Sequence, residues 1–155
     1  MAQPVVVFFD LGDTLGVPRF SAAGSLQRFD VFPFALDVLK RLRGSTPPAA
    51  AKRRLGVISN TGTETAENLR AVLQAAGLSK LLDPALLLFS SIEGIDKSSP
   101  ELFARAAQRA GLAAQRCVFV GESEKERNVA ASAGLAVSFH PLHAFHVVAG
   151  LEAGP

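Results

Sequence analysis

Five short apolar runs restrict what this chain can fold into. They span residues 5–9, 55–58, 86–89, 117–120 and 135–139. The runs lack the strict alternation of apolar and polar residues that marks a half-buried strand. Apolar runs of this kind are typical of strands covered on both faces of a parallel sheet. We therefore predict a five-stranded sheet that is mostly parallel.

Helical patterns occupy the intervals between these runs. Amphipathic spacing predicts helices over residues 34–43, 61–76, 99–110 and 124–133. Thr61 and Glu64 have the spacing of a capping box, and Ser99 followed by Pro100 favours a helix start. Strands that alternate with helices of this length predict right-handed crossovers. The expected architecture is a doubly wound α/β sheet with helices on both faces.

Length and composition are those of one ordinary globular domain, which we place over residues 1–155. The net charge of +2 gives no specific signal for a nucleic-acid or membrane partner. Cys117 is the single cysteine and is expected to pack as a small buried residue, which suits a reducing compartment. The first apolar run is too short for a signal peptide or a membrane span. We predict a cytoplasmic protein with no membrane partner.

Polar residues follow several of the predicted strands. Asp10 follows the first run, Ser59 and Asn60 follow the second, and Glu122 comes after the fourth. Lys97 lies just before the third helix. Ligands of open α/β sheets bind at the carboxyl ends of the strands. A carboxylate, a hydroxyl, an ammonium and a second acid at that edge would suit phosphoryl transfer, in which positioning and charge neutralisation dominate.

These residues carry a resemblance to the haloacid dehalogenase (HAD) superfamily. The run FFDLGDTL over residues 8–15 resembles its first motif, in which a strand ends in Asp-x-Asp-x-Thr. Residues 57–60 (VISN) are similar to the second motif, Lys97 to the third, and residues 120–126 (VGESEKE) to the fourth. The order and spacing agree across nearly the whole chain. The resemblance implies an HAD-like fold without a cap domain.

The resemblance also implies roles for individual residues. Asp10 would be the nucleophile that forms an aspartyl-phosphate. Ser59 and Asn60 would bind the substrate, with the Ser59 hydroxyl on the phosphoryl oxygens. Lys97 would neutralise the charge of the phosphate and of the nucleophile.

A magnesium ion is the cofactor that the resemblance implies. Its ligands would be the Asp10 carboxylate, the Gly12 carbonyl and the acids Glu122 and Glu126, with water and phosphate completing the shell. The family usually has Asp in a Gly-Asp-x-x-x-Asp pattern, whereas both acids here are glutamates. Glu126 has an alternative role in a capping box with Ser123 at the start of the fourth helix.

The clearest departure from the family is Gly12. Family phosphatases carry at this position an Asp that protonates the leaving oxygen and then activates water. Asp13 is adjacent and could replace it only if its side chain reached the same place. Loss of a general acid or base typically costs a factor of about 10² to 10⁴ in rate.

Two functions remain open on the sequence. The first is a Mg²⁺-dependent phosphomonoester phosphatase that acts through Asp10. The second is a catalytically impaired HAD-fold module that binds a phosphorylated ligand or a protein partner. The interval between Asp10 and Ser59 is filled by a turn, a helix and a loop over residues 44–54, which leaves no room for a cap. By the resemblance, an uncapped site implies a large or macromolecular substrate, or a homo-oligomer in which a neighbouring subunit supplies the lid. The expected partner is a phosphorylated small molecule or macromolecule.

Three histidines follow the last run, in the segment HPLHAFH. They are His140, His143 and His146. Three histidines could bind a transition metal, but no cysteine or carboxylate lies among them. Pro141 disfavours a regular helix here. We expect loop or surface histidines, with His140 near the site.

Overall fold

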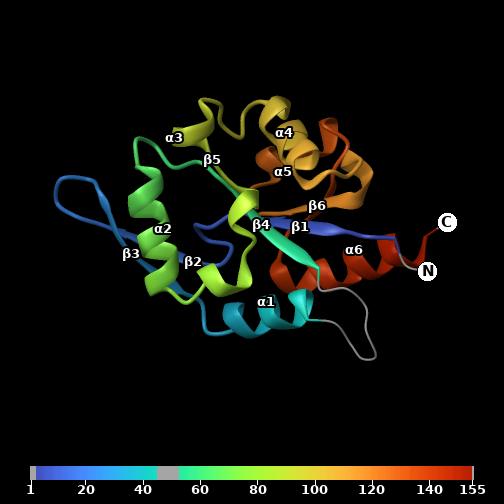
Figure 1. The fold of residues 1–155 in the computed structure, drawn as a ribbon, viewed down its shortest axis with the longest axis horizontal. Helices are drawn as coiled ribbons and strands as arrows, with labels where there is room; N and C mark the ends of the chain where they lie inside the picture. Colours follow the sequence, from blue (N-terminus) through green and yellow to red (C-terminus); the bar gives the residue numbers. More distant parts are fainter. Residues whose placement is uncertain (1–2, 45–52, 155) are drawn as a thin grey trace.

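A five-stranded parallel sheet forms the centre of the protein (Figure 1). The computed structural model describes residues 3–44 and 53–154. The strands of the sheet are β1 (Val6–Phe9), β4 (Arg54–Ser59), β5 (Leu87–Phe89), β6 (Cys117–Val120) and β7 (Ala136–Ser138), in the order β5-β4-β1-β6-β7. All neighbouring pairs run parallel. The five predicted strands are confirmed, and their observed ends differ from the predicted ends by no more than one residue.

Alternate residues of the central strands supply two separate hydrophobic cores. In β1, Val7 and Phe9 join one core, whereas Val6 and Phe8 join the other. Successive side chains of a strand point to opposite faces, so an entirely apolar strand has both faces buried. Cys117 packs in the second core, as expected, and burial raises the pKa of its thiol to about 11.

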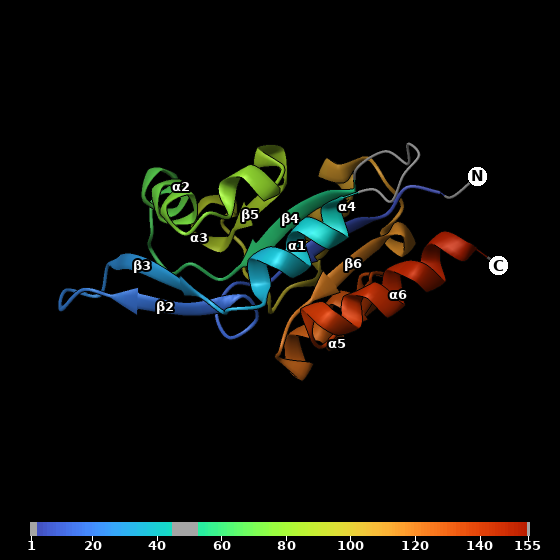
Figure 2. The same cartoon turned by 90° about the horizontal axis from the view of Figure 1, so that it is seen from below.

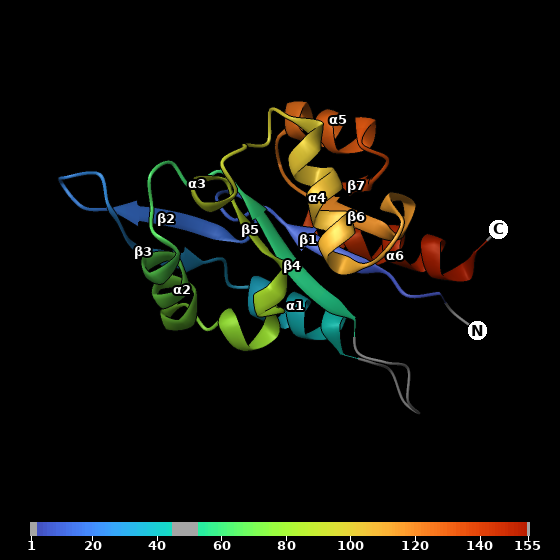
Figure 3. The same cartoon turned by 45° about the horizontal axis from the view of Figure 1, so that its top comes forward.

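Helices cover both faces of the sheet. The helices α1 (Ala35–Arg43) and α6 (Pro141–Ala153) lie on one face, as Figure 2 shows. The helices α4 (Pro100–Ala110) and α5 (Glu124–Ser132) lie on the other face (Figure 3). The doubly wound architecture is therefore confirmed. Over the described residues, no further domain is inserted into it.

An antiparallel hairpin replaces the turn that was predicted after Asp10. It consists of β2 (Gly16–Phe20) and β3 (Leu26–Val31) and projects beyond the sheet beside α2 (Ala66–Ala75) (Figure 2). The connecting turn is closed by hydrogen bonds around Ser21 and by Gly24, which has a φ of 86°. One proline and two arginines interrupt the alternation of apolar and polar residues in these strands, so the sequence pattern does not predict them.

The hairpin depends on a close approach of its strands at Gly16. A Cβ atom on this residue would lie 2.3 Å from the Asp30 carbonyl oxygen. We expect Gly16→Ala to lower the free energy of unfolding by about 1–3 kcal/mol, because the strands must move apart. Urea unfolding measures this change. The control is Gly150→Ala, whose Cβ meets nothing within 4 Å and which we expect to be neutral or slightly stabilising.

Two predictions about helices are wrong, one about where a helix begins and one about whether a segment is helical. The helix expected from Thr61 begins at Ala66, because Thr65 caps it and Glu64 accepts the Leu26 N–H of the hairpin instead of forming a capping box. The segment around Pro141 is helical, since a proline in the first turn lacks only an N–H that has no partner in a helix.

The remaining connections are short. They contain α3 (Ser90–Glu93) and the 3₁₀ turns Ser79–Leu81, Pro84–Leu86 and Ala114–Arg116. Residues 45–52 of the predicted loop lie outside the described part of the chain. Within residues 3–44 and 53–154, the helices are too short or too polar to cross a bilayer.

Candidate active site

Asp10 lies at the point where the three central strands end together. It directly follows β1, which pairs with β4 on one side and β6 on the other. Its backbone N–H donates to the Val120 carbonyl at 2.9 Å, and its side chain is nearly buried. Ser59 ends β4 on the neighbouring strand and is 5% exposed. The register of the sheet thus brings two predicted site residues to one edge.

Lys97 joins two acids at this edge. Its Nζ lies 2.6 Å from Asp10 Oδ1 and 2.7 Å from Glu126 Oε1, and the residue is only 2% exposed. Its backbone N–H donates to Asn60 Oδ1 at 2.9 Å. The amide oxygen of Asn60, predicted to contact substrate, therefore holds the Lys97 backbone in place.

Burial controls the ionisation of Asp10. It raises the pKa of this carboxyl above its ordinary value, and the nearby Glu126 carboxylate raises it further. The Lys97 ammonium lowers the pKa by charge and by its hydrogen bond, but not enough to offset burial. The site therefore holds a carboxylate whose charge is only partly compensated.

This raised pKa predicts a specific pH dependence of stability. The folded state holds the Asp10 proton more tightly than the unfolded state, so this group makes the free energy of unfolding fall as pH rises through the two pKa values. We expect the free energy of unfolding of Asp10→Asn, relative to that of the native protein, to increase progressively as pH rises from the ordinary carboxyl pKa to neutral pH. Urea unfolding of both proteins at a series of pH values measures the difference. A constant difference across that range would contradict the raised pKa.

Glu126 faces the site, contrary to the alternative in which it only takes part in a capping box with Ser123. Ser123 caps α5 by accepting the Glu126 N–H at 3.3 Å, as the capping box predicts. The Glu126 carboxylate, however, pairs with Lys97 instead of turning back to Ser123. Glu122 is exposed, and its backbone N–H donates to Thr14 Oγ1. Of the two acids, Glu126 is therefore the one in direct contact with the site.

The residues after Asp10 differ in their relation to the site. Gly12 lines the cavity next to Asp10, and a Cβ atom there would have Pro18 as its nearest neighbour at 3.7 Å. Asp13 is exposed, does not line the cavity, and has a φ of 61°, in the left-handed region that favours glycine. Nothing in its placement supports Asp13 as a replacement for the missing acid.

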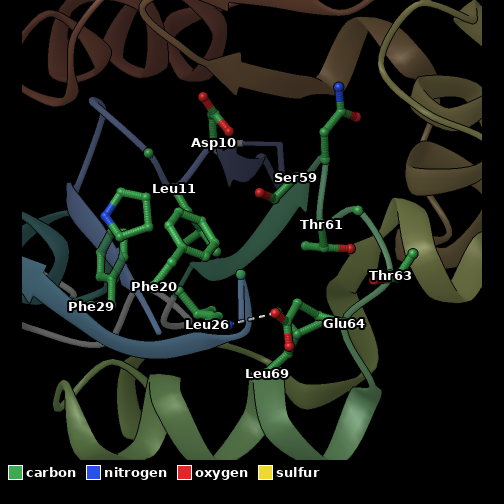
Figure 4. Close-up of a pocket in the computed structure, with 15 residues that line it drawn as sticks. Asp10, Leu11, Phe20, Leu26, Phe29, Ser59, Thr61, Thr63, Glu64 and Leu69 are labelled. Atoms are coloured by element: carbon green, nitrogen blue, oxygen red, sulfur yellow. Dashed lines mark hydrogen bonds between the residues drawn. The ribbon is translucent and has the colours of Figure 1, made fainter. Parts of the chain in front are cut away.

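A cavity of about 420 Å³ opens from Asp10 (Figure 4). Asp10 lies at one end, while Glu64 and Leu69 lie at the other. The hairpin forms one wall, and the segment between β4 and α2 forms another. The lining residues that were not predicted to belong to the site are Leu11, Pro18, Phe20, Gly24, Leu26, Phe29, Thr61, Gly62, Thr63, Glu64 and Leu69. They were missed because most belong to the unpredicted hairpin and to the segment that was assigned to a helix.

A family comparison agrees with this geometry. The sequence model of a hydrolase family, haloacid dehalogenase-like hydrolase, matches residues 19–134. The chain belongs to the HAD-like hydrolase family. The matched segment includes Ser59, Lys97, Glu122 and Glu126, whereas Asp10 precedes it. No curated protein matches the sequence.

Solved structures share the HAD fold with this chain at low sequence identity. A protein from Listeria monocytogenes serotype 4b has a TM-score of 0.77 at 15% identity, covering 96% of this chain and 99% of its own. A HAD-superfamily hydrolase of subfamily IA from Geobacter sulfurreducens has a TM-score of 0.68 at 16% identity, covering 94% and 100%. A predicted phosphoglycolate phosphatase from Haemophilus somnus has a TM-score of 0.57 at 23% identity, covering 72% of this chain and 44% of its own. The first two correspond to this chain over nearly their full length.

The acids of this HAD-like site have the chemistry that a magnesium ion requires. Asp10 and Glu126 present carboxylate oxygens on either side of Lys97, Gly12 lines the cavity beside Asp10, and Glu122 is exposed just before α5. Oxygen ligands of this kind suit Mg²⁺. In the described part of the chain, no three His, Cys, Asp or Glu side chains form a complete metal site. An ion there would need a carbonyl, water and phosphate as further ligands.

The three histidines of this HAD-like chain lie outside the cavity lining. His140 caps α6 by accepting the Leu142 N–H at Nδ1, and its ring lies beside Phe34. His143 is hydrogen-bonded through Nδ1 to the Ser138 hydroxyl at 2.8 Å. These contacts give His140 and His143 roles at the start of α6.

Proposed function

We propose that this chain is a phosphohydrolase that cleaves phosphomonoesters through an aspartyl-phosphate on Asp10. The observation that carries the proposal is the buried Asp10–Lys97 pair beside Ser59 at one end of a cavity. A buried carboxylate at the end of a binding cavity is placed to act as a nucleophile, and its lysine partner offsets charge as phosphate arrives. Membership of the HAD-like hydrolase family supports the same reaction class.

The chemistry runs in two displacements. One oxygen of Asp10 forms a bond to phosphorus while the ester P–O bond breaks, and the departing alcohol takes a proton from water. Water then attacks phosphorus, the bond to Asp10 breaks, and phosphate leaves. The Ser59 hydroxyl donates to a phosphoryl oxygen, and Lys97 stabilises the negative charge during both steps.

Mg²⁺ is the cofactor that fits this proposal. Bound by Asp10, Glu126 and the Gly12 carbonyl, with Glu122 nearby, it would supply positive charge to the phosphoryl group. Lys97 contacts one oxygen of Asp10 and one of Glu126, which would leave the other oxygen of each carboxylate for the ion.

The direct test is phosphate release from a panel of phosphomonoesters, with and without Mg²⁺. We expect slow release that requires the metal. If the folded protein releases no phosphate from any ester, the alternative of an impaired module that binds phosphorylated ligands is favoured. Gly12 motivates that alternative, because it lies at the position of the family acid, and Asp10 and Glu64 are the carboxylates among the described residues that line the cavity.

Installing the missing acid is expected to increase turnover. Gly12→Asp adds a side chain where Pro18 is the nearest neighbour, at 3.7 Å, so the change needs little rearrangement. A positioned general acid and base contributes a factor of about 10² to 10⁴. Combining it with Asp13→Gly removes a non-glycine residue from the left-handed region. The measurement is kcat for one aryl phosphate.

The matched control for this gain is Gly12→Asn. It has the same size and shape as aspartate but cannot exchange a proton at neutral pH. We expect Gly12→Asn to leave kcat within a few-fold of the native value. Equal rates for the Asp and Asn variants would contradict the acid–base explanation.

A further inference from the structure

The cavity beside Asp10 is dominated by apolar side chains. Six large apolar residues line it: Leu11, Pro18, Phe20, Leu26, Phe29 and Leu69. Phe29 and Leu69 are buried in the core, so they form a fixed surface, whereas Phe20 is 58% exposed. The volume of about 420 Å³ falls within the range of small-molecule sites. This space suits the alcohol part of a small ester better than an extended protein segment.

The charges of the cavity are negative. Asp10 and Glu64 are its charged lining residues, and no lysine, arginine or histidine is among the described residues that line it. Two hairpin arginines could have supplied a cation, but Arg19 and Arg28 both pair with Asp30. An anionic group at the end of the cavity distant from Asp10 would therefore meet no positive side chain among the described lining residues.

Glu64 is fixed at the end of the cavity distant from Asp10. Its Oε1 accepts the Leu26 N–H at 2.6 Å, a contact drawn in Figure 4, and its Oε2 accepts from Asn68 Nδ2 at 2.7 Å. These bonds join the hairpin to α2 and hold a negative charge beside Leu26. A carboxylate or a second phosphate on the substrate would be repelled there.

We propose that the substrate is a phosphomonoester whose alcohol part is small, uncharged and apolar, such as an aromatic or branched aliphatic alcohol. The inference rests on the proposed function for the position of the phosphoryl group at Asp10. The hairpin then selects the leaving group through Phe20, Phe29 and Leu26, and Glu64 excludes anionic ones. Of the two partners expected from the sequence, a phosphorylated small molecule or macromolecule, this proposal favours the small molecule, because the hairpin supplies a wall.

Equilibrium binding tests this inference independently of turnover. Phenylphosphonate and phosphonoacetate have no ester bond to break and differ in carrying a phenyl or a carboxylate group. By calorimetry with Mg²⁺ present, we expect phenylphosphonate to bind at least about tenfold more tightly. Kinetics with phenyl phosphate and 2-phosphoglycolate should show the same preference in kcat/KM.

Three variants locate the selectivity. Phe20→Ala should weaken phenylphosphonate binding by a factor on the order of ten, since an aromatic contact is lost. Phe139→Ala is the matched control, because Phe139 is also 58% exposed but does not line the cavity. Glu64→Gln should improve the binding of phosphonoacetate several-fold relative to that of phenylphosphonate, because the negative charge is removed.

The outcomes separate the two proposals. Tighter binding of phosphonoacetate than of phenylphosphonate, or no binding of phenylphosphonate, would overturn the inference about the substrate even if esters are hydrolysed. Phenylphosphonate preference without hydrolysis of any ester would support the apolar site and reject the phosphatase reaction. Equal effects of Phe20→Ala and Phe139→Ala would show that the hairpin does not form the binding site.

Discussion

Asp10→Asn is expected to lower phosphate release by a factor on the order of 10⁴ or more. The carboxylate that forms the covalent intermediate has no substitute among the described residues that line the cavity, where Glu64 lies at the opposite end. Asparagine keeps the size of the side chain, and Lys97 keeps its contact with Glu126. The measurement is kcat for an aryl phosphate at saturating Mg²⁺.

The matched control for this loss is Asp13→Asn. Asp13 lies three residues away, is exposed, and has a left-handed backbone that asparagine also tolerates. We expect its turnover to stay within about twofold of the native rate, since it makes no contact that the reaction uses. Residual turnover of Asp10→Asn at one tenth of the native rate would reject the aspartyl-phosphate. An equal loss in both variants would point to a disturbed loop instead.

Lys97→Met is expected to lower the free energy of unfolding at pH 7 by about 3–5 kcal/mol. Lys97 is 2% exposed and carries the charge that faces both Asp10 and Glu126. Without it, two carboxylates would lie close together at a buried edge. The loss should shrink as pH falls, because protonation of Asp10, whose pKa is already raised by burial, removes one of the charges. Urea unfolding at pH 7 and at acidic pH measures both effects.

Two further variants test the cause of this loss. Lys125→Met removes an exposed lysine of α5 and should change stability by less than about 0.5 kcal/mol. The triple change Lys97→Met, Asp10→Asn and Glu126→Gln removes all three charges and should recover much of the stability. A cost below about 1 kcal/mol for Lys97→Met alone would mean that the carboxylates are not both ionised in the native protein.

The sequence alone determined the sheet and the positions of its polar residues. An apolar strand needs cover on both faces, so the five runs predicted a parallel sheet whose carboxyl ends meet, and this put Asp10 beside Ser59. The start of α4 was equally predictable, because Ser99 and Pro100 act within one turn of helix. These signals depend on residues that are close together along the chain, so they can be recognised in the sequence.

Only the tertiary structure decided which partners the site residues have. Glu126 has the local pattern of a capping residue, and its contact with Lys97 arises from the packing of α5 against the sheet edge. Glu64 likewise has the spacing of a helix cap but bonds to Leu26, 38 residues earlier. The cavity depends on the same long-range pairing, because the hairpin forms a wall only when docked against α2. Such contacts join residues that are distant along the chain, and no pattern within either segment records them.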